Sequence, residues 1–197
     1  SVEAFLCAGL PRPTSFCAGY SATDPALQAL LDTMGFTTSF AAQVIPSGIP
    51  GVSHAPHWYK RIEWGENVTP LSRPYRVGKR SILPVSAKGP FLKRLVEVPL
   101  IADQDIRQAY LYGQPVSRRN ILDFHYEMIR ATGRSSCVPF GIHEVYMEEG
   151  GMRRPVTEEQ RLCLEHVRRI AKRGDVQVRF STASQVSESV YSEPWLW

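Results

Sequence analysis

The sequence has no long apolar run, no block of like charges and few cysteines. No stretch approaches the roughly 18 apolar residues that a membrane-spanning helix requires. Ser1 is not followed by the basic and apolar regions of a signal peptide. We therefore expect a soluble chain, from which a signal peptide could already have been removed, and its compartment stays open. The net charge of +4 is spread along the chain and does not predict a nucleic-acid partner.

The four cysteines share no short spacing typical of a metal site. They are also too few to form a disulfide framework in a chain of 197 residues. Each lies among apolar neighbours, as Cys17 does between Phe16 and Ala18, so we expect buried free thiols that act as small hydrophobic residues. A nucleophilic role for Cys17 would require a basic neighbour, and the sequence shows none.

What is present is an ordinary globular composition, with 43% hydrophobic and 21% charged residues. A chain of this length can form one domain with a substantial core, so we expect a single domain over residues 1–197.

Short apolar runs alternate with amphipathic segments, which predicts strands separated by helices. Asp24 and Pro25 begin the clearest helix, as N-cap and first helical residue, and Gly35 ends it. The predicted helices cover 2–9, 25–34, 117–132 and 157–174, and the predicted strands cover 13–18, 36–41, 81–86, 94–101, 138–143 and 176–180. This order favours an α/β fold with a mostly parallel sheet, as a partial or irregular (β/α) barrel.

Prolines and glycines interrupt any regular pattern between residues 43 and 80. Long irregular segments inside domains are often functional, and we expect a lid or wall beside a cleft. Trp58 and Tyr75 lie in this segment. Aromatic rings of this kind either stack on a sugar or anchor the loop to the core, and both interpretations stay open.

His143 ends a predicted strand just before a helix. In α/β folds the carboxyl ends of parallel strands face the site, so His143 is the best single candidate for a chemical residue. The alternative is a hydrogen bond to a backbone carbonyl. Asp103 also follows a predicted strand, where it could contact substrate or metal, or cap a turn.

The other histidines are weaker candidates. His54 and His57 have metal-ligand spacing, so they could bind zinc or simply pack within a loop. His125 lies on the inner face of a predicted helix and is expected to be a hydrogen-bonded core residue. His166 lies among charged neighbours and is expected to be solvated.

Three segments in order resemble the polysaccharide deacetylases of the NodB-homology type. They are residues 12–20 with the helix and Gly35-Phe36 that follow, the strand 95–99, and residues 141–143 with the later helix and segment 174–184. That family folds as an irregular (β/α) barrel and removes acetyl groups from sugars with a divalent metal, usually zinc. The resemblance implies that His143 protonates the leaving group, and that Tyr20 lies where a backbone amide helps to bind the oxyanion.

The family's metal ligands belong to segments that precede the region resembling 12–20, and only eleven residues precede Arg12. The arginine of the family motif falls at Cys17. We therefore expect the C-terminal part of a deacetylase that acts on an acetylated sugar or small amide, with zinc ligands outside this chain. The alternatives are a noncatalytic carbohydrate-binding module, and a subunit whose open half-barrel is covered by a partner chain.

Overall fold

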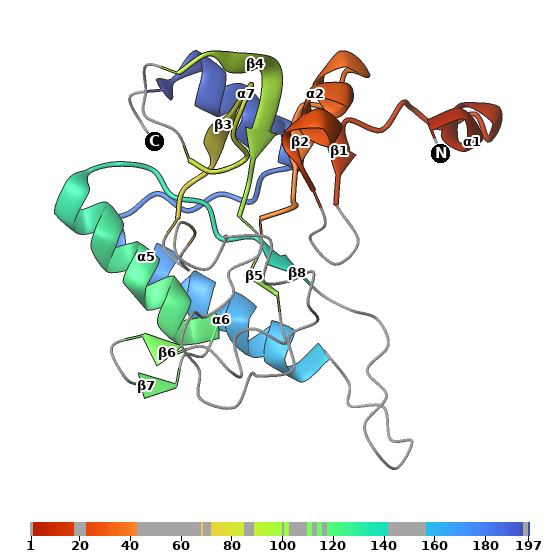
Figure 1. Ribbon diagram of the computed structural model, residues 1–197. Helices are drawn as coiled ribbons and strands as arrows, with labels where there is room; N and C mark the ends of the chain where they lie inside the picture. Colours follow the sequence, from red (N-terminus) through yellow and green to blue (C-terminus); the bar gives the residue numbers. More distant parts are fainter. Residues whose placement is uncertain are drawn as a thin grey trace.

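The structure is a computed structural model of residues 1–197 (Figure 1). It describes residues 2–17, 23–42, 68, 72–84, 89–99, 101–102, 110–111, 114–115, 118–141, 157–194 and 197.

A four-stranded sheet organises the N-terminal half. Its strands are β1 (Ser15–Phe16), β2 (Thr38–Ser39), β3 (Tyr75–Gly78) and β4 (Phe91–Glu97), in the order β1-β2-β4-β3. β1, β2 and β4 run parallel, and β3 pairs antiparallel with β4 at the edge. The α/β class with a mostly parallel sheet is confirmed. The sheet is open, and the described strands do not close into a barrel.

Helices cover both faces of this sheet. α2 (Pro25–Thr33) packs on one side of β4, and α7 (Ala183–Ser192) packs on the other. Successive strand residues point to opposite faces. Leu95 accordingly joins a core with Leu31 of α2, whereas Val96 joins a second core with Val186 of α7. Both strand residues are fully buried, so β4 is the centre of the layer structure.

A second group of elements lies beside the sheet (Figure 1). β5 (Ile101–Ala102) follows β4 after a break at Pro99 and pairs in parallel with β8 (Phe140–Gly141). β6 (Tyr110–Leu111) and β7 (Gln114–Pro115) form a small antiparallel ladder. α5 (Arg118–Thr132) and α6 (Thr157–Arg173) lie side by side, and each ends at a glycine with positive φ. None of the described helices is long and apolar enough to span a membrane.

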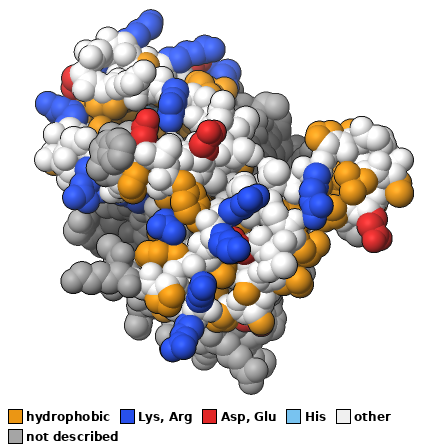
Figure 2. All heavy atoms as spheres, turned by 90° about the horizontal axis from the view of Figure 1, so that it is seen from above, with side chains coloured by type: hydrophobic (Ala, Val, Ile, Leu, Met, Phe, Trp, Pro, Cys, Tyr) orange, Lys and Arg blue, Asp and Glu red, His pale blue; other side chains and the backbone are white. Residues whose placement is uncertain are grey.

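α1 (Val2–Cys7) projects from the body and buries none of its residues (Figure 1). Phe5, Leu6 and Leu10 leave about half of their surface exposed, at 45%, 50% and 52%. Their side chains form an apolar lobe at one end of the molecule (Figure 2).

The structure corrects two strand predictions. β3 lies inside the segment predicted to be irregular, whereas residues 81–84 of the predicted strand 81–86 form no strand. Prolines interrupt the sequence pattern around β3, and its partner β4 belongs to a separate segment. The local pattern therefore did not predict this strand. Residues 176–180 alternate like a half-buried strand but pair with no described strand, and Phe180 is 78% exposed.

α7 was not predicted from the sequence. Its serines and β-branched residues are only moderate helix formers. The helix begins with a capping box in which Thr182 N donates to Gln185 Oε1 at 2.8 Å and Gln185 N donates to Thr182 Oγ1 at 3.3 Å. Ser187 is buried against the sheet and its Oγ lies 2.6 Å from Thr38 Oγ1. The contact with the sheet therefore decides the conformation here. Trp197 packs on the same core.

The cysteine prediction is correct in part. All four cysteines are free. Only Cys163 is buried, Cys137 is partly buried, and Cys7 and Cys17 are exposed. An apolar neighbour in sequence does not ensure burial, because the neighbour's side chain can point to another face.

Asp32 replaces a missing strand beside the first part of β4. β2 is short, and its pairing reaches only the end of β4. The Asp32 carboxylate accepts from the backbone amides of Lys93, Arg94 and Leu95 at 3.0, 2.7 and 3.1 Å. Asp32 therefore supplies acceptors that a longer β2 would otherwise provide.

We predict that Asp32→Ala lowers the free energy of unfolding by about 2 kcal/mol or more, because three strand donors lose a charged acceptor. Urea denaturation at neutral pH measures this change. The neighbouring exposed variant Thr33→Ala is the control and should change the free energy by less than about 0.5 kcal/mol. Equal effects of the two variants would contradict the role of Asp32.

Candidate functional site

The carboxyl ends of β1, β2 and β4 meet at one edge of the sheet, because these strands are parallel (Figure 1). Cys17 follows β1, Ala41 and Ala42 lie just beyond β2, and Glu97 ends β4. This edge is where α/β proteins usually bind ligands.

Glu97 is the central polar residue of this edge. Its side chain is 1% exposed. Oε1 accepts from the backbone amides of Ala41 at 2.8 Å and Ala42 at 2.7 Å. Oε2 is buried and has no hydrogen-bond partner within the described part of the chain. A carboxyl group from β4 therefore holds the chain where it leaves β2.

A buried amide connects α2 to the same edge. Gln28 is fully buried, and its Nε2 donates to Ser39 Oγ at 3.1 Å and to Thr23 Oγ1 at 2.9 Å. The Ser39 hydroxyl in turn lies close enough to the Glu97 carboxyl group to lower its pKa. Gln28 Oε1 is the second buried oxygen that lacks a partner among described residues. Gln28, Ser39 and Glu97 thus form a polar chain inside an apolar layer, which we call the strand-end network.

Burial decides the protonation state of Glu97. Removal of the carboxyl group from water raises its pKa to about 8. The Ala42 amide, the Ser39 hydroxyl and the Ala41 amide favour the charged form and offset only part of this effect. Glu97 therefore carries a proton at neutral pH.

The neighbouring acids of Glu97 are also held in their neutral forms. Desolvation, and then the charge of Glu97, raise the pKa of the Cys17 thiol. The same two causes raise the pKa of Tyr75 well above its ordinary value. Cys17 Sγ lies 3.6 Å from the carbonyl oxygen of Phe40. A thiol with a raised pKa is a poor nucleophile, in agreement with the interpretation of Cys17 from the sequence.

These residues do not fit a zinc centre. Zinc binds deprotonated thiolates and carboxylates, usually with three or four protein ligands. The described residues contain no group of three or more His, Cys, Asp or Glu side chains that could hold a metal ion.

Of the residues proposed from the sequence to contact substrate, the structure describes Tyr75. Its main chain lies opposite Glu97 in the sheet, and its hydroxyl donates to the carbonyl oxygen of Ile82 at 2.8 Å. This bond anchors the segment that follows β3. The proposed substrate contact remains a prediction.

The remaining proposed site residues lie outside the described residues. They are Tyr20, His54, His57, Trp58, Asp103 and His143. The strands that precede two of them are nevertheless paired, with Ala102 of β5 opposite Gly141 of β8. Asp103 follows β5 directly, and His143 is the second residue after β8. The main chain therefore enters both segments from neighbouring strand ends.

Two other histidines have structural partners. His125 is 2% exposed and its Nδ1 hydrogen-bonds to Ser136 Oγ, which confirms the predicted core role. His166 was expected to be solvated, and this is wrong. Its side chain is 14% exposed and Nε2 lies 2.8 Å from Asp123 Oδ1 on α5. The packing of α6 on α5 brings this ion-pair partner from a distant segment.

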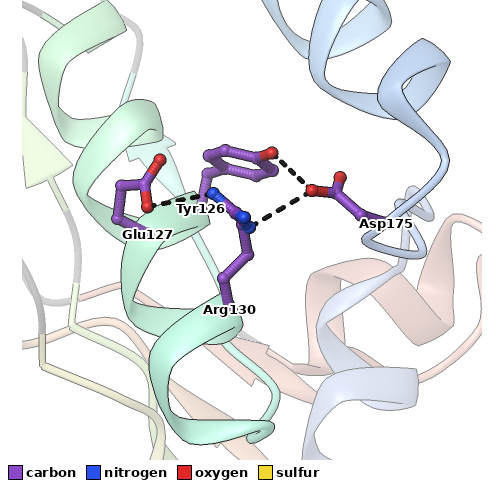
Figure 3. A network of polar contacts seen from close by, with 4 residues as sticks. All are labelled: Tyr126, Glu127, Arg130 and Asp175. Atoms are coloured by element: carbon purple, nitrogen blue, oxygen red, sulfur yellow. Dashed lines mark hydrogen bonds and ion pairs between the residues drawn. The ribbon is translucent and has the colours of Figure 1, made fainter.

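A polar network joins the end of α6 to α5 (Figure 3). The hydroxyl of Tyr126 donates to Asp175 Oδ2 at 2.7 Å, and Arg130 Nε lies 3.2 Å from the same oxygen. Arg130 also reaches Glu127 at 3.5 Å, and the Arg173 guanidinium lies 4.7 Å from the centre of the Tyr126 ring. The hydrogen bond from Tyr126 contributes most to the lowered pKa of Asp175. These contacts account for the helix pairing without a ligand.

Comparison with protein-family models, curated proteins and solved structures finds no match to this chain.

Sequence reasoning missed the strand-end network. Glu97 lies within the run Leu95-Val96-Glu97-Val98, where a single charged residue interrupts a buried strand. A charged residue in such a run is unusual and could have identified Glu97. Gln28 had no comparable signal, because glutamine is common in amphipathic helices.

We predict that Glu97→Gln removes a pH-dependent loss of stability. The pKa of Glu97 is raised from 4.5 to about 8, so its stabilising contribution is complete below pH 4.5 and is lost as the pH rises to about 8. Each unit of pKa difference corresponds to about 1.4 kcal/mol. Glutamine keeps the carbonyl acceptor for the Ala41 and Ala42 amides but does not ionise.

Urea denaturation at pH 5 and pH 8 measures this difference. Stability should fall by a few kcal/mol more in the natural protein than in Glu97→Gln. Glu188→Gln, at an exposed position of α7, is the control and should follow the natural protein. Identical pH dependence in Glu97→Gln and the natural protein would refute the buried, protonated carboxyl group.

Proposed function

We propose that this chain is the substrate-facing part of a deacetylase-type hydrolase that acts on an N-acetylated sugar or a related small amide. The proposal rests on the resemblance of its ordered segments to the NodB-homology deacetylases. The observation that supports it best is the shared edge at which the three parallel strands end. The α/β fold and the order of the three resembling segments are thus compatible with a partial (β/α) barrel of this family.

In this proposal His143 donates a proton to the departing amine. An imidazole is suited to this step, because its ordinary pKa lies near neutral pH. A backbone amide near Tyr20 would bind the oxyanion, and Trp58, Tyr75 and Asp103 would contact the substrate. Support for His143 comes from the strand β8, which ends at Gly141 beside the end of β5.

The divalent metal of this proposal, zinc by resemblance, would have its ligands outside the described residues. His54 and His57 remain weak candidates as ligands. A partner chain or a preceding segment would supply the others. Such a partner would also cover the open sheet and complete the barrel.

We predict that the complete gene product, supplied with zinc, releases acetate from an N-acetylglucosamine oligosaccharide. His143→Ala should lower kcat by about 100-fold or more, because a general acid contributes at least this factor. Its KM should change by only a few fold. Acetate release is measured enzymatically, and circular dichroism verifies that each variant is folded.

His166→Ala provides the matched control, since its imidazole pairs with Asp123 in the α5–α6 contact. This variant should keep kcat within a few fold of the natural protein. Oligosaccharide binding without turnover would favour a noncatalytic binding module instead. Absence of both binding and turnover in the complete, zinc-loaded protein would overturn the proposal.

A further inference from the structure

Glu97 makes contacts that a purely structural residue in a buried strand would not require. An apolar residue could fill the same place in the layer between α2 and α7. Glu97 instead places a carboxyl group at the strand end and directs Oε1 to two successive amides just beyond β2. Ala41 and Ala42 are both fully buried, so their amides have no access to water and need this acceptor.

The chain held in this way leads into the predicted lid or wall. Residues 41 and 42 immediately precede the segment that carries Trp58. A side chain from β4 therefore holds Ala41 and Ala42, the last described residues before this segment. The strand-end network adds a second constraint, because Gln28 and Ser39 fix the end of β2 from the side of α2.

We propose that Glu97 is a positioning residue, a proton-dependent latch that fixes residues 41 and 42 where the chain leaves β2. In the neutral form, Oε1 of Glu97 accepts hydrogen bonds from the two amides, and the proton lies on Oε2. Ionisation places a charge in a site without a cation among the described contacts, and opening of the latch then lets the carboxylate reach water. The link to substrate binding rests on the proposed function, whereas the latch itself does not.

Among the described residues at this edge, Glu97 is the group that titrates between pH 5 and pH 8. The titratable groups facing it from neighbouring described elements are Cys17 after β1 and Tyr75 on β3. Both have pKa values raised above ordinary values that already lie at or above 9.0, so both stay neutral in this range. Ser39 and Gln28 do not ionise. A pH effect at this edge that disappears in Glu97→Gln can therefore be assigned to Glu97.

Hydrogen exchange of the Ala41 and Ala42 amides tests the latch directly. Their protection factors, corrected for the intrinsic exchange rate, should fall by up to about tenfold per pH unit between pH 5 and pH 8. The reason is that the carboxyl group binds its proton more tightly in the closed state than in the open state. The amide of Val190 in α7 serves as an internal reference for global unfolding, and its protection should stay above that of Ala41 and Ala42 as the pH rises.

Three variants separate the latch from general stability. Glu97→Gln keeps the acceptor and cannot ionise, so the protection of both amides should become independent of pH. Glu97→Leu removes the acceptor and should lower their protection at every pH. Glu188→Gln should behave like the natural protein. If Glu97→Leu does not fold, Glu97→Gln alone still decides the question.

Three results would overturn the latch: a pH-independent protection factor in the natural protein, the same pH dependence in Glu97→Gln, or protection of Ala41 and Ala42 equal to that of Val190 at every pH. The last result would mean that Glu97 affects only global unfolding. Exchange needs no substrate, so failure of the deacetylase assay leaves this test intact. Conversely, an active enzyme in which the protection of Ala41 and Ala42 does not change with pH would contradict the latch but not the proposed function.

Discussion

The pairing of the Glu97 carboxyl group with the chain beyond β2 is the constraint on which the candidate site depends. It combines a fully buried ionisable side chain with two backbone amides that have no other acceptor among the described residues. A buried carboxyl group is costly, and the cost is limited here because the group stays protonated. The site edge is therefore held by polar contacts rather than by packing alone.

The two halves of the molecule are stabilised by different means. Around the sheet, α2 and α7 bury two apolar cores on opposite faces of β4, and Asp32 satisfies the first amides of that strand. In the α5–α6 pair, a buried Tyr126 is combined with exposed ion pairs around Asp175 (Figure 3). Exposed ion pairs contribute little individually, so the buried ring accounts for more of this contact.

Capping and periodicity made part of the fold predictable. Asp24 and Pro25 placed the start of α2 correctly, and glycines at 35, 133 and 174 marked the ends of three helices. The candidate site was less predictable. Strand-end position predicted His143 and Asp103, which lie outside the described residues, and Glu97 and Gln28 were missed because their partners come from segments 11 to 56 residues away. Local patterns carry no information about such contacts.

The sequence by itself determined the α/β class, the helix boundaries with strong caps, and the free state of the cysteines. The tertiary structure decided which segments became strands and which ionisable groups lost contact with water. β3 exists because β4 offers a partner, and residues 176–180 remain irregular because no described strand pairs with them. A strand needs hydrogen bonds from another segment, whereas a helix satisfies its own backbone, and this difference explains which predictions succeeded.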